Sequence, residues 1–326
     1  MNNIIPIVDT CYTPYSYSTR MVTIHTEDRD VTKYPYENVF EVELPSTLKN
    51  ILSLELFDIQ LPTFYYNISE NLYNSKLWFS VPSYFQEPIQ LIIPSGCYDY
   101  NELAVELAKQ LNHFTTKELF RIGAYMDPNT RYTDFNVIYN VNERRYTIQN
   151  KKDTFILWFN KPSVYPCNAG YSEQLLRNLG ICFNLGFNKE KYESIYVTDL
   201  ADPTTVNTYC IKSIQIAKLD FNNTIYMEID TYNWIDEALP FSKSTTSFYN
   251  NDFNGNVNNC FAKLILSDVN KTYVPVDKFK RVLPHMVERI LRLKFKFRYH
   301  NGILVDFMDQ PFNFSLKFHC KFDCKV

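Results

Sequence analysis

The sequence predicts a mainly β protein: a jelly-roll type antiparallel β-sandwich with an inserted α+β subdomain. The first observation is compositional, because the 326 residues include 25 Tyr and 25 Phe but only 7 Gly, and aromatic residues are enriched in strands. The second is strict alternation of apolar and polar residues in several segments, which is the period of a half-buried strand. The third is a single long segment with helical period, and β patterning resumes after it.

The segment 24–69 predicts three strands with two turns. A charged turn at 27–30 separates a strand ending at His25 from the alternating residues 40–44. Pro45 is expected to close that second strand, because proline cannot donate to a strand ladder. The apolar run 51–61 then predicts a central strand that is covered on both faces.

The period changes after Gly96. Two short strands are expected at 77–81 and 89–93, and then Asp99 and Glu102 form a capping-box pattern in front of an apolar stripe over 100–111, which predicts a helix. Strands are expected at 135–139, 146–148 and 155–159, and a second helix from Ser172 to a left-handed Gly180. These patterns predict an N-terminal arm at 1–21, a sandwich formed by 22–96 and 200–326, and an α+β insertion at 97–199.

The last third of the chain returns to strand patterning. Strands are expected at 211–219, 225–229 and 261–266, a long polar loop at 241–259 and an irregular crossing at 268–284. Two very regular strands, 291–299 and 312–322, follow, each with one apolar and one polar face. If these two strands pair, their polar faces form a basic panel that is a candidate interface; the alternative is a solvated sheet face. The panel consists of Arg292, Lys294, Lys296, Arg298, Lys317, His319 and Lys321.

Several kinds of chemistry are not indicated. The net charge is −3, so no general basic excess favours nucleic acid, and glycine-rich phosphate loops and catalytic motifs are absent from the sequence. We therefore expect neither an enzyme nor a cofactor.

His319, Cys320 and Cys324 are the nearest approach to a metal cluster, but His319 and Cys320 would point to opposite faces of a strand, so we expect no metal. The carboxylate pairs Asp28/Asp30 and Glu41/Glu43 are better explained as turn and solvent-facing residues. Eight scattered cysteines indicate reduced, mostly buried thiols. Neither a secretory signal nor an apolar run long enough to span a membrane is seen.

The order of these motifs resembles a known family. A charged turn, a Tyr-Pro at 34–35, a strand ending in Leu-Pro and a second strand closed by Leu-Pro and Tyr-Asn-Ile resemble the minor capsid proteins of large icosahedral DNA viruses that infect eukaryotes. The resemblance extends to Gly96-Cys97-Tyr98 before the helix, to 302–307 and to 312–316. It departs at Asp309, where the family pattern has Gly.

The resemblance implies a non-enzymatic virion component that packs beneath or between the capsomers of a shell. Its expected partners are the major capsid protein and other minor capsid proteins, with assembly in the host cytoplasm and with no specific nucleic acid. The alternative within this class is a penton at the vertex, which would form a pentamer. The alternative from another class is a receptor- or glycan-binding surface module.

Overall fold

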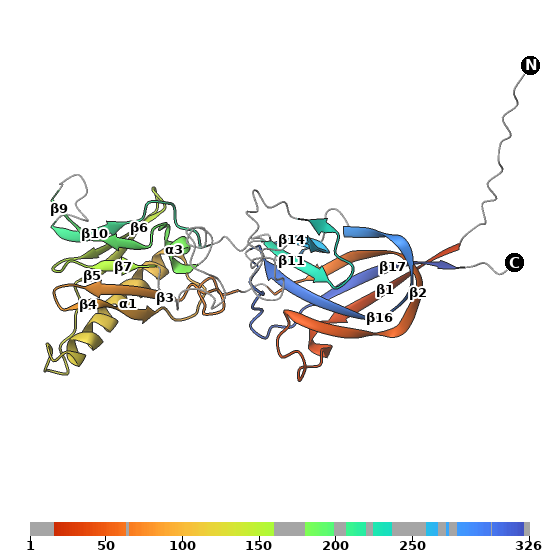
Figure 1. Cartoon of the computed structure of the whole chain (residues 1–326), viewed down its shortest axis with the longest axis horizontal. Coiled ribbons are helices and arrows are strands. Elements are labelled where there is room, and N and C mark those ends of the chain that lie inside the picture. Colours follow the sequence, from red (N-terminus) through yellow and green to blue (C-terminus); the bar gives the residue numbers. More distant parts are fainter. Residues whose placement is uncertain are drawn as a thin grey trace, which may run out of the picture.

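The computed structural model describes residues 16–62, 65–159, 180–198, 207–219, 224–236, 259–266, 272–273, 279–300 and 302–322. The predicted fold class is confirmed: the protein is mainly β, with curled antiparallel sheets and few helices. Figure 1 shows two lobes along the long axis. One lobe holds the first and last strands of the described chain, and the other holds the helices α1 and α3.

The first lobe is built on one seven-stranded antiparallel sheet. Its strand order is β1-β17-β2-β16-β11-β14, and β15 also pairs with β2. The strands are β1 (Ser16–His25), β2 (Val39–Gln60), β11 (Thr224–Ile229), β14 (Ala262–Ile265), β15 (Thr272–Tyr273), β16 (Phe279–Tyr299) and β17 (Asn313–Phe322). A two-stranded ribbon, β12 (Ile235–Asp236) with β13 (Asn259–Cys260), accompanies it. Strands from both ends of the sequence therefore form the centre of one sheet.

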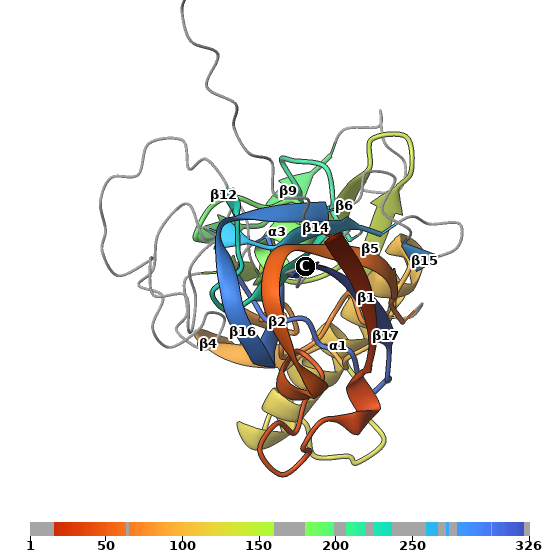
Figure 2. The same ribbon diagram turned by 90° about the vertical axis from the view of Figure 1, so that its right-hand side faces the viewer.

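The seven-stranded sheet folds over on itself to make two layers. Phe314 of β17 is paired in register with Ile59 of β2. Phe40 begins the same strand, and a straight strand of that length would separate it from Ile59 by roughly 60 Å. The ring centroids of Phe40 and Phe314 are nevertheless only 6.4 Å apart. β2 and β16 therefore bend together, and Figure 2 shows both as arcs around the core.

The interior between the two layers is aromatic. Phe295 packs on Phe314 at 4.9 Å, and Phe297 packs edge-on against Phe312 at 5.2 Å. Aromatic pairs in such tilted and edge-to-face arrangements add to the stability gained from burying their area. The predicted alternation is confirmed over 293–299 and 312–320, because the apolar residues of these two segments are buried in this core.

Two prolines lie inside strands: Pro45 was expected to end a strand, and Pro284 was expected in an irregular crossing. Pro45 does not end a strand, since β2 continues through it to Gln60. Pro284 lies within β16, so the irregular crossing predicted for 268–284 is wrong from Phe279 onward. Both prolines fall where the β2–β16 register is irregular. A bulge leaves backbone groups outside the ladder, so a missing N–H is tolerated there, and bulges also help a strand to bend between layers.

The second lobe combines two four-stranded sheets with helix α1 (Tyr100–Arg121). One sheet has the order β4-β3-β7-β8 and the other β5-β6-β10-β9. The bounds are β3 (Lys76–Val81), β4 (Phe85–Ile92), β5 (Phe135–Asn140), β6 (Arg145–Asn150), β7 (Ile156–Trp158), α3 (Gly180–Leu185), β8 (Lys191–Glu193), β9 (Ile195–Val197) and β10 (Thr208–Lys212). The predicted capping box is confirmed: the Asp99 carboxylate accepts from the Glu102 N–H, and the Glu102 carboxylate accepts from the Asp99 N–H.

The observed strands differ from the predictions at the N-terminal arm, at the boundary between sandwich and insertion, and in one predicted strand. β1 begins at Ser16, so residues 16–21 of the predicted arm are a strand, while 1–15 lie outside the described residues. β3 and β4, expected in the sandwich, pair with each other and with β7 of the predicted insertion. The strand expected at 211–219 is confirmed only at its first two residues, because β10 ends at Lys212 and 213–219 lie outside any strand. The second helix before Gly180 and the polar loop up to residue 258 lie outside the described residues. Whether the two lobes fold separately remains a prediction.

Candidate functional site

The predicted basic panel is divided in the structure. β16 and β17 are not neighbours, because β2 lies between them in the sheet. The outward face of β2 carries carboxylates, and they stand opposite the cations. Arg292 pairs in register with Glu43, and Lys317 pairs in register with Glu55. The condition on which the panel depended, direct pairing of the two basic strands, is therefore not met.

The four cations of β16 each lie beside a carboxylate. Arg292 is 62% exposed and contacts Glu43 at 3.1 Å. Lys294 approaches Asp230, in the turn directly after β11, at 3.8 Å. Arg298 is only 3% exposed, and its Nε lies 3.1 Å from Glu228, which also lies 3.8 Å from the Lys296 Nζ. The two ends of the row thus differ: Arg292 and Lys294 lie at the surface, whereas Arg298 is part of the buried structure.

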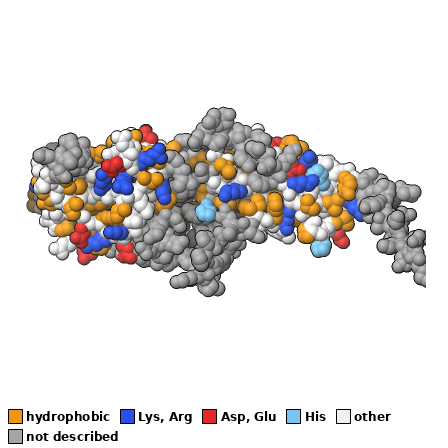
Figure 3. Space-filling view, turned by 90° about the horizontal axis from the view of Figure 1, so that it is seen from above, with side chains coloured by type: hydrophobic (Ala, Val, Ile, Leu, Met, Phe, Trp, Pro, Cys, Tyr) orange, Lys and Arg blue, Asp and Glu red, His pale blue; other side chains and the backbone are white. Residues whose placement is uncertain are grey.

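The β17 cations have their own neighbours. Lys317 lies over the ring of Phe57 at 5.9 Å, and the His319 Nε2 lies 3.6 Å from Glu55. Lys321 lies opposite Tyr17 of β1. Across the sheet, the basic residues of β17 and β16 alternate with the carboxylates of β2 and with Glu228 of β11, and opposite charges on neighbouring strands stabilise a sheet. Figure 3 shows Lys and Arg side chains as separate small groups on the face that it presents.

Burial affects the acid partner of Arg298. The pKa of Glu228 is raised above its usual value, chiefly because burial removes water from the carboxylate, while Arg298 and Lys296 act in the opposite direction. Arg298 also donates to the carbonyl of Gly302 at 2.8 Å. This group connects β16 to the segment that follows it and to β11, which is a role in folding.

No cluster of metal-ligand side chains occurs among the residues that the structure describes. Cys320 is buried in the core, and His319 lies on the other face toward Glu55. Cys324 lies outside the described residues. Cys182, Cys210 and Cys260 are also buried, whereas Cys97 is exposed. Within the described part of the chain, no helix is long and apolar enough to cross a membrane.

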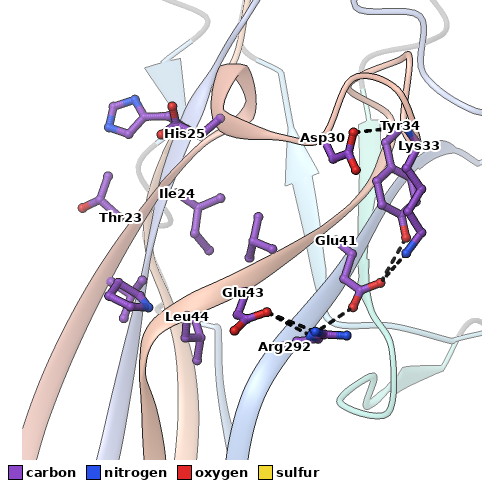
Figure 4. A pocket seen from close by; sticks show the side chains of 14 residues that line it. Thr23, Ile24, His25, Asp30, Lys33, Tyr34, Glu41, Glu43, Leu44 and Arg292 are labelled. Carbon is purple, nitrogen blue, oxygen red and sulfur yellow. Dashed lines mark hydrogen bonds and ion pairs between the residues drawn. The ribbon is translucent and has the colours of Figure 1, made fainter.

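A pocket of about 490 Å³ opens beside the predicted panel, at the side of the sandwich where β1 faces the first half of β2. Figure 4 shows Ile24 pointing into the space between these strands, while Thr23 and His25 point to the other side of β1. Apolar residues from both layers form its floor, and charged residues surround its mouth. The apolar lining residues are Val22, Ile24, Val42, Leu44 and Pro45; the polar ones are Thr23, His25, Asp28, Asp30, Lys33, Tyr34, Glu41, Glu43 and Arg292.

The turn that closes one end of the pocket is held by Arg29. Its guanidinium donates to the carbonyls of Thr26 at 2.9 Å, Tyr34 at 3.0 Å and Pro35 at 2.9 Å. It also forms an ion pair with Glu37 at 2.8 Å, with only 8% and 4% of the two side chains exposed. The charged turn predicted at 27–30 is thus confirmed as a turn. A planar guanidinium with five donors can hold several carbonyls and a carboxylate at once.

A network along the mouth connects this turn to β2 and β16. The Tyr34 hydroxyl donates to Glu41 at 3.1 Å, and the Lys33 Nζ lies 3.4 Å from the same oxygen. The pKa of Glu41 is lowered, chiefly by the hydrogen bond from Tyr34. Arg292 reaches Glu43 from the adjacent strand β16, as the dashed lines in Figure 4 show. Glu41, 26% exposed, is therefore held by Tyr34 and Lys33, whereas Glu43 remains 59% exposed, as expected for a solvent-facing carboxylate.

The sequence indicated some residues of this pocket but not that these residues lie close together. Alternation identified Val42 and Leu44 as core-facing residues, and Ile24 was expected only to lie in the strand that ends at His25. Nothing in the local pattern shows that β1 and the first half of β2 lie at the same open side of the sandwich, because that depends on the bend of β2.

No protein-family model matches the sequence, and no curated protein matches it. Among solved structures, the chain is similar to the mavirus penton protein, with 11% identity and a TM-score of 0.38 over 93% of this chain and 99% of that one. It is also similar to a chain of the Sputnik virophage structure, with 9% identity and a TM-score of 0.34 over 93% and 98% of the two chains. At these scores neither similarity assigns a function to this chain.

Proposed function

We propose that this chain is a structural protein of a viral capsid. The supporting observation is that the two segments carrying the family resemblance, near opposite ends of the sequence, meet in the structure. The backbone N–H of Thr26 donates to the Phe312 carbonyl at 2.9 Å, and the Thr26 hydroxyl accepts from the Phe312 N–H at 2.9 Å. The Asn38 side chain donates to the Val305 carbonyl at 2.9 Å. The resembling residues thus join the two ends of one sandwich.

The position where the sequence departs from the family pattern fits the same proposal. Met308 and Asp309 both have φ of 54°, in the left-handed region that glycine adopts most easily. Aspartate tolerates this region better than most residues. The backbone thus has the conformation that Gly would favour there, and the departure changes the residue without changing the turn.

Within a capsid, we propose the vertex position of a penton, and the minor-capsid position beneath or between capsomers is the second candidate. A vertex protein needs one end that faces the shell and another that projects from it. The described chain has such a polarity: β1 begins and β17 ends at one end of the sandwich, and the second lobe lies at the opposite end (Figure 1). The partners would be neighbouring copies and major capsid protein capsomers in the virion.

Native mass spectrometry of the purified full chain tests the two positions. A penton predicts an assembly of about five times the 38.6 kDa chain mass. A monomer that is found between capsomers in intact particles by cryo-electron microscopy supports the minor-capsid position. Absence from purified particles, together with saturable binding on a glycan array, would contradict both positions and support a surface-binding module.

A further inference from the structure

We propose that the pocket between β1 and the first half of β2 is a docking site for an extended segment of a partner protein that carries lysine or arginine side chains. The segment would pair with a free strand edge and place apolar side chains on the floor of the pocket. This site does not depend on the capsid function, because its binding can be measured with the isolated protein.

The first support is the strand pairing. Among the described residues, β1 pairs only with β17, and residues 39–48 of β2 pair only with β16. β17 meets β2 only from Ile51 onward. Each strand at the pocket therefore presents one edge without a strand partner in the described chain, and such an edge is a template for an added strand.

The second support is the floor. Ile24 and Leu44 belong to the core, with 5% and 4% of their surface exposed, and Val22 and Val42 beside them are half-buried. Two of these residues come from each layer of the sandwich. The pocket thus exposes the edge of the hydrophobic core between the layers. An extended segment with apolar side chains at alternate positions has the period needed to cover it.

The third support is charge. The mouth carries four carboxylates, Asp28, Asp30, Glu41 and Glu43, against two full cations, Lys33 and Arg292, which leaves a formal charge of −2 with His25 neutral. The lowered pKa of Glu41 keeps that carboxylate ionised at neutral pH. A segment with basic side chains facing the mouth would complement this charge, whereas an acidic segment would be repelled.

The walls are also held in place before any partner binds. Arg29 fixes the turn through Glu37 and three carbonyls, and the Tyr34 hydroxyl fixes Glu41. A preformed site binds more tightly because the partner does not have to order it.

The test uses the full chain and fluorescein-labelled peptides of alternating lysine and valine, followed by fluorescence anisotropy. We expect saturable binding of the lysine peptide and at least about tenfold weaker binding of the same peptide with glutamate in place of lysine. N-methylation on the hydrogen-bonding edge of the peptide should weaken binding by a similar factor. Hydrogen exchange should show the peptide protecting amides at 22–25 or 41–44.

Protein variants locate the binding. Glu43→Lys should weaken the lysine peptide about tenfold and strengthen the glutamate peptide. Glu87→Lys is the matched control, because Glu87 is an exposed residue of β4 in the other lobe, and it should leave binding unchanged. Circular dichroism of both variants checks the fold.

Any one of the following results would overturn the proposal. They are no saturable binding of the lysine peptide, equal affinity for methylated and unmethylated peptides, and an equal effect of Glu43→Lys and Glu87→Lys. If only a variant that lacks residues 1–15 binds the peptide, the chain's own first residues occupy the pocket. This result would also contradict the proposal of an external partner.

Discussion

Removal of the Arg29 charge should destabilise the sandwich more than any exposed ion pair can. Arg29→Met keeps most of the side-chain volume but leaves the Glu37 carboxylate, only 4% exposed, without its cation. Breaking a buried ion pair by removing one partner typically costs about 3–5 kcal/mol. Three backbone carbonyls lose a donor as well. We therefore expect the free energy of unfolding to fall by about 4 kcal/mol.

The assay is guanidinium unfolding followed by circular dichroism, with hydrogen exchange at 26–38 to place the loss in the first lobe. Lys109→Met is the control: its pair with Glu106 on α1 has a 68% exposed lysine and should contribute about 0.5 kcal/mol or less. The double variant Arg29→Met with Glu37→Met should be about 2 kcal/mol more stable than Arg29→Met alone, because no buried charge remains. A cost below about 1 kcal/mol for Arg29→Met, or a double variant less stable than the single one, would refute the reasoning.

Three further predictions follow from the charged strands and the C-terminal turn. Arg298→Glu should lower the free energy of unfolding by more than about 3 kcal/mol, because it places a second carboxylate beside the buried Glu228. Arg292→Glu, at an exposed pair, should lower it by about 1 kcal/mol or less. Thermal unfolding of both variants checks this, and equally small effects would contradict the burial of Arg298. Tyr34→Phe should cost about 1 kcal/mol at pH 7. The pKa of Glu41 is lowered in the fold, so the stability that it contributes is present above the usual 4.5 and is lost as the pH falls through the folded value. The stability difference between wild type and Tyr34→Phe should therefore shrink as the pH is lowered below 4.5, and a difference that does not shrink on acidification would count against the hydrogen bond. Asp309→Gly should raise the free energy of unfolding by about 0.5 kcal/mol, since glycine adopts the positive φ without strain, and a loss measured by chemical unfolding would contradict this.

Local patterns predicted the elements whose cause is local. The capping box at Asp99 marked the start of α1, because a cap depends on residues within one turn. The alternation of 291–299 identified which side chains enter the core, because successive residues of a strand point to opposite faces. The charged turn before β2 was also predicted, although the ion pair of Arg29 with Glu37 inside it was not.

The sequence by itself determined that this chain is mainly β and which face of each regular strand is apolar. Only the tertiary structure decided which strands are neighbours. Arg292 and Arg298 are indistinguishable by alternation, yet one is 62% exposed and the other 3%, because β11 and the segment after β16 cover only the second. The pocket has the same origin: β2 bends near Pro45, and this bend sets its first half opposite β1. Strand period is fixed by the backbone of adjacent residues, whereas strand order and sheet curvature depend on contacts between residues far apart in sequence.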